Sequence, residues 1–560
     1  MKRPCCLFVA SLVLALTLGQ TALAQDGESQ PAKYWIFLQD KRDAAGKATV
    51  PETNYLTERA RQRRLRRGTA TPSSFDAPLS PAYLDALRQR GVTPLMQSRW
   101  LNAVSARLDA RQVATVRTLS FVREVRPVAP LFVPPEPKAA AQASLAPVAR
   151  KNTRLDYGSS QQQLEVINAI PALERGINGT GVRIGFLDTE FGGFQHASLV
   201  HVVNQGRLLG LENFAAEPNG SLHGRSVASV AVGFDEGDLI GPGYGAEVLA
   251  ATTEFEPTET NQEEDNFVAG LEWMEALGVD VVNTSLGYSE FDAGQHSYTP
   301  ADLDGDTGIT TRAADRAAAL GVVVVTSAGN EGNAAWRFIT MPADGDSVIA
   351  VGGVTSEGVK AGFSGVGPTA DGRIKPDVSA LGVGVTIASG SAYSTNGSGT
   401  SYASPIVAGV VAQILQVNPD LNPIEVRDLL RETASQPTSP NNSIGWGVID
   451  ADAAVQRAEQ LATDVADTTP LPDAFTVMPP YPNPFTEKTT FEVHTPERAG
   501  FVQLRVYNLL GRLVAVPFEG PLHPGLHRLV FNAASLPAGL YLYRLESDHA
   551  VHSGKMVVVR

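Results

Sequence analysis

Three side chains that could together perform nucleophilic catalysis occur in the order Asp188, His223 and Ser401. Asp188 ends a short apolar segment and His223 opens an apolar helical run. Ser401 precedes the apolar run Ile406–Val417, which predicts a buried helix. A carboxylate can orient an imidazole, and the imidazole can then deprotonate a hydroxyl. A serine at a helix N-terminus also has backbone N–H groups beside its oxygen, as a developing oxyanion requires. Taken alone, Ser401 could equally be an ordinary N-cap.

Two further segments carry residues that could assist such a reaction. Val322–Gly332 is a β-branched strand that runs into a glycine turn carrying the amide of Asn330. Another predicted strand ends in the small-residue turn formed by Ser285, Leu286 and Gly287. By itself, this tripeptide could simply form a turn with no functional role.

Taken together and in this order, the segments resemble the subtilisin-like serine proteases, the subtilases. The resemblance implies a serine endopeptidase in which Ser401 attacks a peptide carbonyl, His223 transfers the proton and Asp188 holds the imidazole. It also implies that Asn330 supplies the side-chain donor of the oxyanion hole. The strand Ser285–Gly287 would pair with extended substrate. The implied partners are protein or peptide substrates, and the chemistry requires no cofactor.

The chain departs from the subtilase pattern beside two of these residues. Glu190 stands shortly after Asp188 where subtilases more often have glycine, and Arg225 stands shortly after His223 where threonine is commoner. Arg225 could add positive charge near His223 and lower its basicity. These substitutions bear on the efficiency of the reaction and not on its class.

Between residues 160 and 460, buried-strand runs alternate with helices. Continuous β-branched runs between helices predict an α/β fold, a parallel sheet covered by helices on both faces, as in a subtilisin-like peptidase domain. Asp188 and Asn330 then fall just past the C-terminal ends of their strands, where open α/β sheets place ligands. The predicted strands are Ile184–Leu187, Val248–Thr252, Val279–Asn283, Gly321–Thr326 and Ser347–Val351.

Residues 1–24 have the pattern of a secretory signal peptide, with a charged start, a short apolar core and the small-residue motif Ala22-Leu23-Ala24. The core is too short to span a bilayer, and no later segment reaches transmembrane length without polar interruption. We therefore expect a secreted protein without a transmembrane segment, exported through the periplasm and then extracellular or attached to the cell surface. Cys5 and Cys6 both lie in this leader, so the mature chain would contain no cysteine.

Residues 25–150 are predicted to form a small α+β domain followed by a linker. Subtilases commonly carry such a pro-segment, which acts as folding chaperone and inhibitor of the zymogen until it is cleaved. The alternative is a simple accessory domain. The Pro- and Ala-rich stretch 127–149 is a candidate exposed linker for self-cleavage. The predicted strands are 34–38, 103–108 and 121–125, and the predicted helices are 81–90 and 109–119.

Charged residues are unevenly distributed along the chain. The formal net charge is −14, but basic residues outnumber acidic ones in residues 25–150 and the reverse holds in residues 151–560. This asymmetry predicts two parts that attract one another. A cluster of six arginines between Arg59 and Arg67 lacks the interleaved aromatic residues expected of a nucleic-acid site. We interpret it as a solvated helix face and expect no nucleic-acid partner.

Residues 461–480 are predicted to be a second linker, and residues 481–560 a β-sandwich, because short strands alternate there with Gly and Pro turns. The segments Tyr481–Phe485, Val506–Arg512 and Lys555–Arg560 resemble the C-terminal sorting domain of proteins exported by the type IX secretion system of Bacteroidetes-like bacteria. That resemblance implies the type IX machinery as a partner. A carbohydrate- or protein-binding sandwich is the alternative, although no aromatic platform supports it.

One acidic loop has the composition of a calcium site. Asp302, Asp304 and Asp306 alternate around Gly305. The EF-hand pattern fails, because Thr307 stands where glycine is needed. Subtilases often bind structural calcium, so a structural calcium ion is compatible with the chain. A solvated turn is the favoured interpretation of this loop, and no metal ligand is assigned.

Two other functions stay open at this point. A subtilase fold could be exported as a non-enzymatic surface-binding protein, although all four chemical groups of the site are present. The protein could also be a protease dedicated to one target, such as the maturation of another secreted protein.

Overall fold

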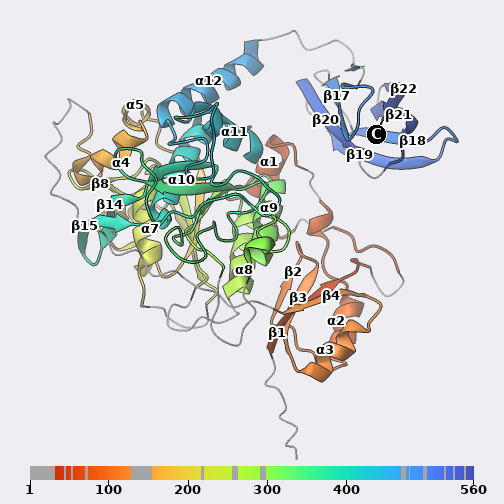
Figure 1. Ribbon diagram of the computed structural model, residues 1–560, viewed down its shortest axis with the longest axis horizontal. Helices are drawn as coiled ribbons and strands as arrows, with labels where there is room; N and C mark the ends of the chain where they lie inside the picture. The colour runs from red at the N-terminus through yellow and green to blue at the C-terminus, as the bar shows by residue number, and fades with distance from the viewer. Residues whose placement is uncertain are drawn as a thin grey trace, which may run out of the picture.

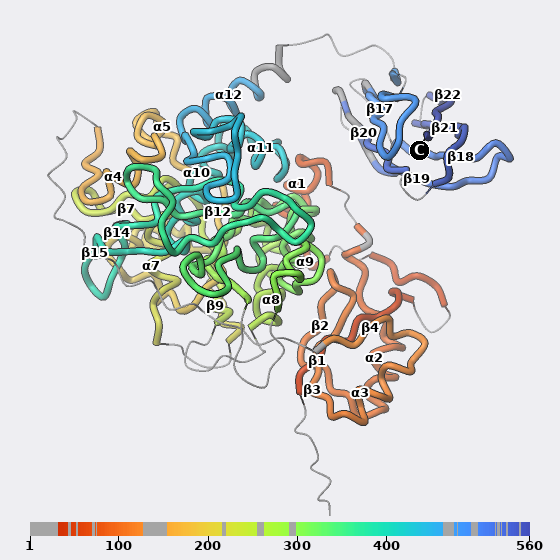
Figure 2. Tube along the Cα trace, in the orientation of Figure 1, coloured from red at the N-terminus to blue at the C-terminus, as the bar shows by residue number. Residues whose placement is uncertain are grey.

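The computed structural model describes most of the chain between Ala32 and Val559 (Figures 1 and 2). The predicted signal peptide and nearly all of the predicted linker at 127–149 lie outside the described residues. The residues described are 32–42, 46–51, 54–69, 73–127, 154–215, 220–254, 263–289, 298–467, 475–478, 480–495, 501–522, 525–533, 536–547 and 550–559.

The N-terminal domain is an antiparallel sheet in the order β2-β3-β1-β4, with two helices against one face (Figure 1). All five elements predicted here are present, and β2 is an addition. The sheet is buried on both faces: Ile36 and Leu38 pack with its own helices, whereas Trp35 and Phe37 join a core of the central domain. The elements are β1 (Ala32–Leu38), α2 (Pro81–Arg88), β2 (Met96–Ser98), β3 (Ala103–Leu108), α3 (Ala110–Arg117) and β4 (Val122–Pro127).

The central domain is built on seven parallel strands in the order β13-β12-β11-β10-β5-β9-β6. The five predicted strands are the five inner ones. The two edge strands escape prediction because β6 is mostly exposed and β13 is short, so neither contains a long apolar run. The strands are β5 (Arg183–Asp188), β6 (Leu208–Asn213), β9 (Glu247–Thr252), β10 (Val281–Thr284), β11 (Val323–Ser327), β12 (Ile349–Val354) and β13 (Val378–Leu381).

Helices cover both faces of this sheet, which confirms the predicted fold class (Figure 1). Neighbouring valines of one strand enter opposite cores: Val281 packs with α7 and α10, and Val282 packs with α8 and α9. The covering helices are α7 (His223–Val232), α8 (Glu263–Ala276), α9 (Ile309–Ala319) and α10 (Thr400–Val417). The remaining elements of the domain are α4 (Gln161–Val166), α5 (Ile170–Glu174), α6 (Val200–Asn204), β7 (Phe234–Asp235), β8 (Leu239–Ile240), β14 (Val383–Ser389), β15 (Ala392–Ser398), α11 (Pro423–Thr433) and α12 (Ala451–Asp467).

Helix α10 is the core helix of the domain. Within the described part of the chain it is the one helix with the length and hydropathy of a membrane span, but 89% of that window is buried inside the protein. It begins at Thr400, earlier than predicted, so Ser401 lies in its first turn. Helix α12 runs past residue 461 into the range predicted as linker, because its amphipathic pattern continues there.

The C-terminal region is a sandwich of two antiparallel sheets, ordered β16-β17-β20 and β19-β18-β21-β22. Side chains from both sheets, including Phe491 and Leu504, share one core. This confirms the predicted sandwich. The strands are β16 (Thr476–Val477), β17 (Lys488–Thr495), β18 (Phe501–Tyr507), β19 (Leu513–Pro521), β20 (Gly525–Asn532), β21 (Gly539–Ser547) and β22 (Val551–Val558).

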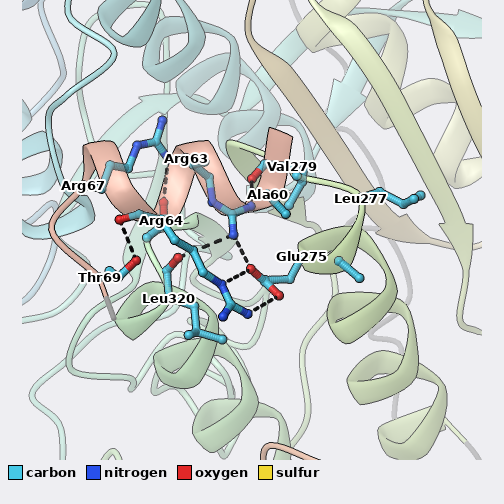
Figure 3. A network of polar contacts seen from close by, with 12 residues as sticks. Ala60, Arg63, Arg64, Arg67, Thr69, Glu275, Leu277, Val279 and Leu320 are labelled. Atoms are coloured by element: carbon cyan, nitrogen blue, oxygen red, sulfur yellow. Dashed lines mark hydrogen bonds and ion pairs between the residues drawn. The ribbon is translucent and has the colours of Figure 1, made fainter. Parts of the chain in front are cut away.

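The arginine cluster forms a helix, α1 (Glu58–Arg66), but the prediction of a solvated face is wrong for half of it. Arg63, Arg64 and Arg67 are buried. They reach into the central domain between the ends of α8 and α9 (Figure 3). The sequence pattern could not reveal this, because their partners lie more than 200 residues further along the chain.

The first turn of α8 is unusually acidic for a buried position. Glu264 and Asp265 are almost fully buried. Asp265 pairs with Lys33 of β1 at 2.6 Å, and Glu264 accepts a hydrogen bond from the Tyr298 hydroxyl at 2.8 Å. Burial raises the pKa of Glu264 to about 8. Glu264 is therefore largely protonated in the folded protein at neutral pH.

This pKa predicts how stability depends on pH. An unfolded Glu ionises near pH 4.3, so between about pH 4.5 and pH 8 the folded state holds a proton that the unfolded state has lost. The free energy of unfolding should therefore fall as pH rises through this window. The measurement uses a Ser401→Ala protein, which lacks the candidate nucleophile. We expect its thermal midpoint to decrease from pH 5 to pH 8. The decrease should be less steep when Glu264→Gln is added. Glu236→Gln, at an exposed position, should keep the full slope. Equal slopes for the two glutamine variants would contradict the assignment.

Candidate active site

The predicted carboxylate and imidazole meet at the C-terminal edge of the central sheet. Asp188 is the last residue of β5, and His223 is the first residue of α7. Asp188 Oδ1 lies 2.6 Å from His223 Nδ1. The same oxygen accepts a hydrogen bond from the Thr189 backbone N–H at 2.8 Å. Asp188 is fully buried, whereas 15% of the His223 side chain is exposed. The carboxylate thus fixes the ring through Nδ1 and leaves Nε2 as the nitrogen that can exchange a proton.

Glycine is required directly after His223. A Cβ on Gly224 would lie 2.7 Å from the Thr189 carbonyl oxygen and 3.0 Å from Asp188 Cβ. The Gly224 N–H donates to Thr189 Oγ1 at 3.0 Å. The turn after β5 therefore packs directly against the start of α7, and this contact sets the distance between Asp188 and His223. No local sequence pattern marks Gly224 as a positioning residue.

Ser401 lies in the first turn of α10, after Gly399, whose φ is +152°. That backbone conformation is open to glycine and costly for other residues. The first backbone N–H groups of a helix have no partner within it, so the Ser401 N–H is one of the orphan donors of this turn. In this structure the Ser401 hydroxyl donates to the Ser285 carbonyl at 3.2 Å.

Asn330 is held in one orientation by the residue before the serine. Its Oδ1 accepts hydrogen bonds from the Thr400 backbone N–H at 2.9 Å and from Thr400 Oγ1 at 3.0 Å. Because the Thr400 backbone N–H can only donate, the Asn330 atom that it faces is the oxygen of the amide. The Nδ2 group is then the donor that remains for a substrate oxygen. Thr400 is a second positioning residue, and no local sequence pattern marks it as one.

The tripeptide Ser285, Leu286 and Gly287 continues β10 and contacts the start of α10. Ser285 Oγ donates to the Ser401 carbonyl at 2.8 Å and accepts from Asn283 Nδ2 at 3.0 Å. A Cβ on Gly287 would lie 2.3 Å from Thr340 Oγ1, so this position also requires glycine. The structure thus places the predicted substrate strand beside the predicted nucleophile.

A buried glutamate lies close to Asp188. Glu254 follows β9, and its Oε1 accepts hydrogen bonds from Thr253 Oγ1 at 3.1 Å and from the Tyr288 hydroxyl at 3.2 Å. Burial, reinforced by the charge of Asp188, raises the pKa of Glu254 to about 8. Glu254 is therefore mostly neutral at pH 7 and adds little second negative charge beside the pair. The only sequence signal for it is an acidic residue just after a buried strand.

The two departures from the subtilase pattern occupy defined places. The Glu190 carboxylate accepts a hydrogen bond from the Gly220 N–H at 3.2 Å. The Arg225 side chain is buried and lies beside Gly192, 3.8 Å from where a Cβ on that glycine would be. Burial lowers the pKa of the Arg225 guanidinium. Both residues therefore help to pack the loops that flank Asp188 and His223.

The acidic loop considered as a calcium site is organised by its own backbone. Asp304 Oδ1 accepts from the Asp306 and Thr307 backbone N–H groups at 2.9 and 2.7 Å. Asp302 Oδ2 accepts from the Thr299 N–H at 2.7 Å. These bonds describe a turn and a helix cap. Across the residues that the structure describes, no group of His, Cys, Asp or Glu side chains is arranged to hold a metal ion.

Comparison with protein families matches three parts of the chain. Residues 179–447 match the subtilase family. Residues 33–143 match the peptidase S8 propeptide domain of Bacteroidota, and residues 480–559 match a secretion system C-terminal sorting domain. Each match overlaps a region predicted from the sequence to be the same kind of domain, and the boundaries of those regions stay a prediction.

Two of the relatives are matched over nearly their whole length. The chain is 33% identical over 296 residues to subtilisin DY of Bacillus licheniformis, covering 52% of this chain and 97% of that protein. It is 30% identical over 305 residues to the subtilisin of Bacillus pumilus, covering 54% and 98%. A solved structure of proteases from Pseudoalteromonas arctica PAMC 21717 aligns with 24% identity and a TM-score of 0.43, covering 55% of this chain and 100% of that one.

The packing of Gly224 generates a prediction. In Gly224→Ala the added methyl group must displace the Thr189 carbonyl or the start of α7, which separates Asp188 from His223. We expect kcat for peptide hydrolysis to fall at least about tenfold, because small displacements of catalytic groups cost large factors in rate. Steady-state kinetics beside a thermal melt would measure this. Gly520→Ala, where a Cβ meets nothing closer than 3.7 Å, is the matched control. Unchanged kcat in a folded Gly224→Ala protein would contradict the positioning role.

Proposed function

Because the chain belongs to the subtilase family, we propose that this subtilisin-like serine protease is an endopeptidase that works through Asp188, His223 and Ser401. The observation that carries the proposal is the 2.6 Å contact between Asp188 and His223 at the sheet edge where Ser401 also lies. That contact prepares the imidazole to act as a base toward a hydroxyl.

The proposed reaction begins when a peptide carbonyl is bound against Ser401. The hydroxyl turns from the Ser285 carbonyl toward His223, and Nε2 takes its proton as Oγ attacks the carbonyl carbon. The imidazolium is stabilised by Asp188 and passes the proton to the leaving amine, which gives an acyl-enzyme. A water molecule, deprotonated by His223 in the same way, then hydrolyses the acyl-enzyme and releases the carboxylic acid product. No cofactor takes part in these steps.

Two donors would stabilise the tetrahedral intermediate. The Asn330 Nδ2 group is aimed by the bonds that its Oδ1 receives from Thr400, and the Ser401 backbone N–H lies in the first turn of α10. Both are fixed before substrate binds, so little reorganisation opposes the reaction. The supporting observation is that Thr400 contacts the Asn330 amide and directly precedes Ser401, so one residue fixes both donors.

For substrate binding we assign Ser285, Leu286 and Gly287 as the strand that pairs with an extended peptide. This segment directly follows β10, and its contact with Ser401 would hold the scissile bond beside the nucleophile. Protein and peptide chains are therefore the proposed substrates.

The protein carries a propeptide domain and a C-terminal sorting domain, so it is a zymogen that is secreted or displayed at the cell surface. We further propose the order signal peptide 1–24, pro-segment and linker 25–150, peptidase domain 160–460, linker 461–480 and sorting domain 481–560. In this proposal the chain crosses the periplasm, and the type IX machinery recognises the last domain.

The proposed nucleophile can be tested with a fluorophosphonate probe. Protein freed of its pro-segment should be labelled, and the Ser401→Ala protein should not, because the probe reacts with activated serines. If the pro-segment is removed by the protein itself, Ser401→Ala should also keep its full-length N-terminus when purified alone. Absence of label on mature, folded wild-type protein would contradict the proposal and favour a non-enzymatic surface-binding protein.

The oxyanion donor gives a second test. Asn330→Ala should lower kcat by about 10²–10³-fold with a smaller change in KM, a magnitude established for such a donor in subtilisin itself, a member of the same family. Asn330→Asp keeps an oxygen for Thr400 but loses the Nδ2 donor, so it should also be slow while its thermal midpoint stays near that of the wild type. A kcat within about threefold of wild type in both variants would rule out this role for Asn330.

A further inference from the structure

Helix α1 lies apart from the N-terminal sheet and docks on the peptidase domain (Figures 1 and 3). Its N-cap, Thr57, donates its backbone N–H and its hydroxyl to the Ala276 carbonyl at the end of α8, at 2.9 and 3.1 Å. The inward face of the helix carries Ala60, Arg63 and Arg64. Because this buried face carries two guanidinium groups, it requires partners of opposite charge.

The first partner is Glu275, which is fully buried. Arg64 donates two hydrogen bonds to Glu275, from Nε to Oε1 at 2.9 Å and from Nη2 to Oε2 at 2.8 Å. Arg63 also donates to Glu275 and to the Leu320 carbonyl at the end of α9. Paired, forked contacts of this kind are the strong form of the ion pair. Arg64 in turn binds Asp76 of its own domain at 2.9 Å, which ties α1 to the rest of the pro-segment.

The second partner is Asp280, directly before β10. Arg59 contacts its Oδ2 at 2.6 Å, and Arg67 contacts its Oδ1 at 3.2 Å. Burial opposes ionisation of Asp280, but the charges of Arg67, Arg59 and Arg63 together hold its pKa below the usual value. Arg59 also donates to the Gly181 and Gly278 carbonyls at 2.8 and 3.2 Å. These carbonyls precede strands or follow helices, so they have free acceptor capacity.

These contacts lie at the opposite edge of the sheet from the triad. Gly181 and Asp280 precede β5 and β10, whereas Asp188 is the last residue of β5. A strand of six residues spans roughly 20 Å, at about 3.3 Å per residue. Attachment through α1 therefore leaves the catalytic groups uncovered.

We propose that α1 is an arginine anchor that holds the pro-segment on the peptidase domain from the sheet edge opposite the active site. Cutting the linker after β4 then does not release the pro-segment, and the pairs with Glu275 and Asp280 lengthen the lifetime of the cut complex beyond what the contacts of β1 with the peptidase domain provide. The surface of the peptidase domain around Glu275 and Asp280 is therefore a binding site for guanidinium groups. This proposal goes beyond the proposed activity and holds whether or not Ser401 is reactive.

The experiment uses the full chain with Ser401→Ala and a recognition sequence for a site-specific protease inserted between residues 128 and 153. The protein is immobilised through its C-terminus and cut, and the release of the N-terminal fragment is followed over time. In Arg63→Ala/Arg64→Ala the release rate should rise at least about 30-fold, because truncating buried charge partners acts on dissociation. Arg61→Ala/Arg66→Ala removes the same charge from the outer side of the same helix, and should stay within about threefold of the parent.

Other variants keep the proposal open to refutation if the double arginine variant does not fold. Glu275→Gln preserves shape but removes the charge, and it should also speed release. A saturating peptide competitor for the active site should leave the release rate unchanged. Equal release from both double arginine variants would overturn the proposal, as would slow release from Glu275→Gln. Release accelerated by the competitor would assign the attachment to the active site instead.

Discussion

The parallel pairing of β11, β10 and β5 is the constraint on which the site depends. Thr284 of β10 is level with Leu187 of β5 and with Thr326 of β11. The next residue on each strand therefore falls in one row at the C-terminal edge, with neighbouring strands about 4.8 Å apart. That row brings Asp188 and Ser285 together, and Asn330 follows a few residues later on the third strand. Helix α10 then needs only to begin at this edge to bring Ser401 to the other groups.

The same parallelism creates a second, chemically different edge. All strands begin at the opposite side, where helices α8 and α9 end and their last carbonyl oxygens have no partner within the helix. That edge is electronegative and carries Glu275 and Asp280, so it suits cations. The sheet thus separates a catalytic edge from an attachment edge by the length of its strands. Helix α1 bound at one edge and a substrate bound at the other do not compete for the same atoms.

The inner strands of the sheet were predictable because β-branched runs such as Val322–Val325 have no other stable location in a soluble domain. The proposed catalytic groups were identified by family resemblance, and the structure places Asp188 against His223 at the edge where Ser401 lies in the first turn of α10. Thr400 and Gly224 were missed because their importance depends on contacts with residues far along the chain, to which a local pattern gives no access. The arginines of α1 were misread for the same reason: a pattern that counts arginine as polar assigns every one of them to solvent.

The charge asymmetry of the chain acts at two ranges in this structure. At long range a basic pro-segment and an acidic body attract, as the composition indicates. At short range the attraction is concentrated in a few buried pairs, and a buried guanidinium without its carboxylate is strongly unfavourable. Arg63 and Arg67 lie four residues apart and face inward, while Arg66 faces solvent. Rotating α1 by one residue would bury the wrong arginine and leave Glu275 unpaired, so the pairs select one docking of the helix.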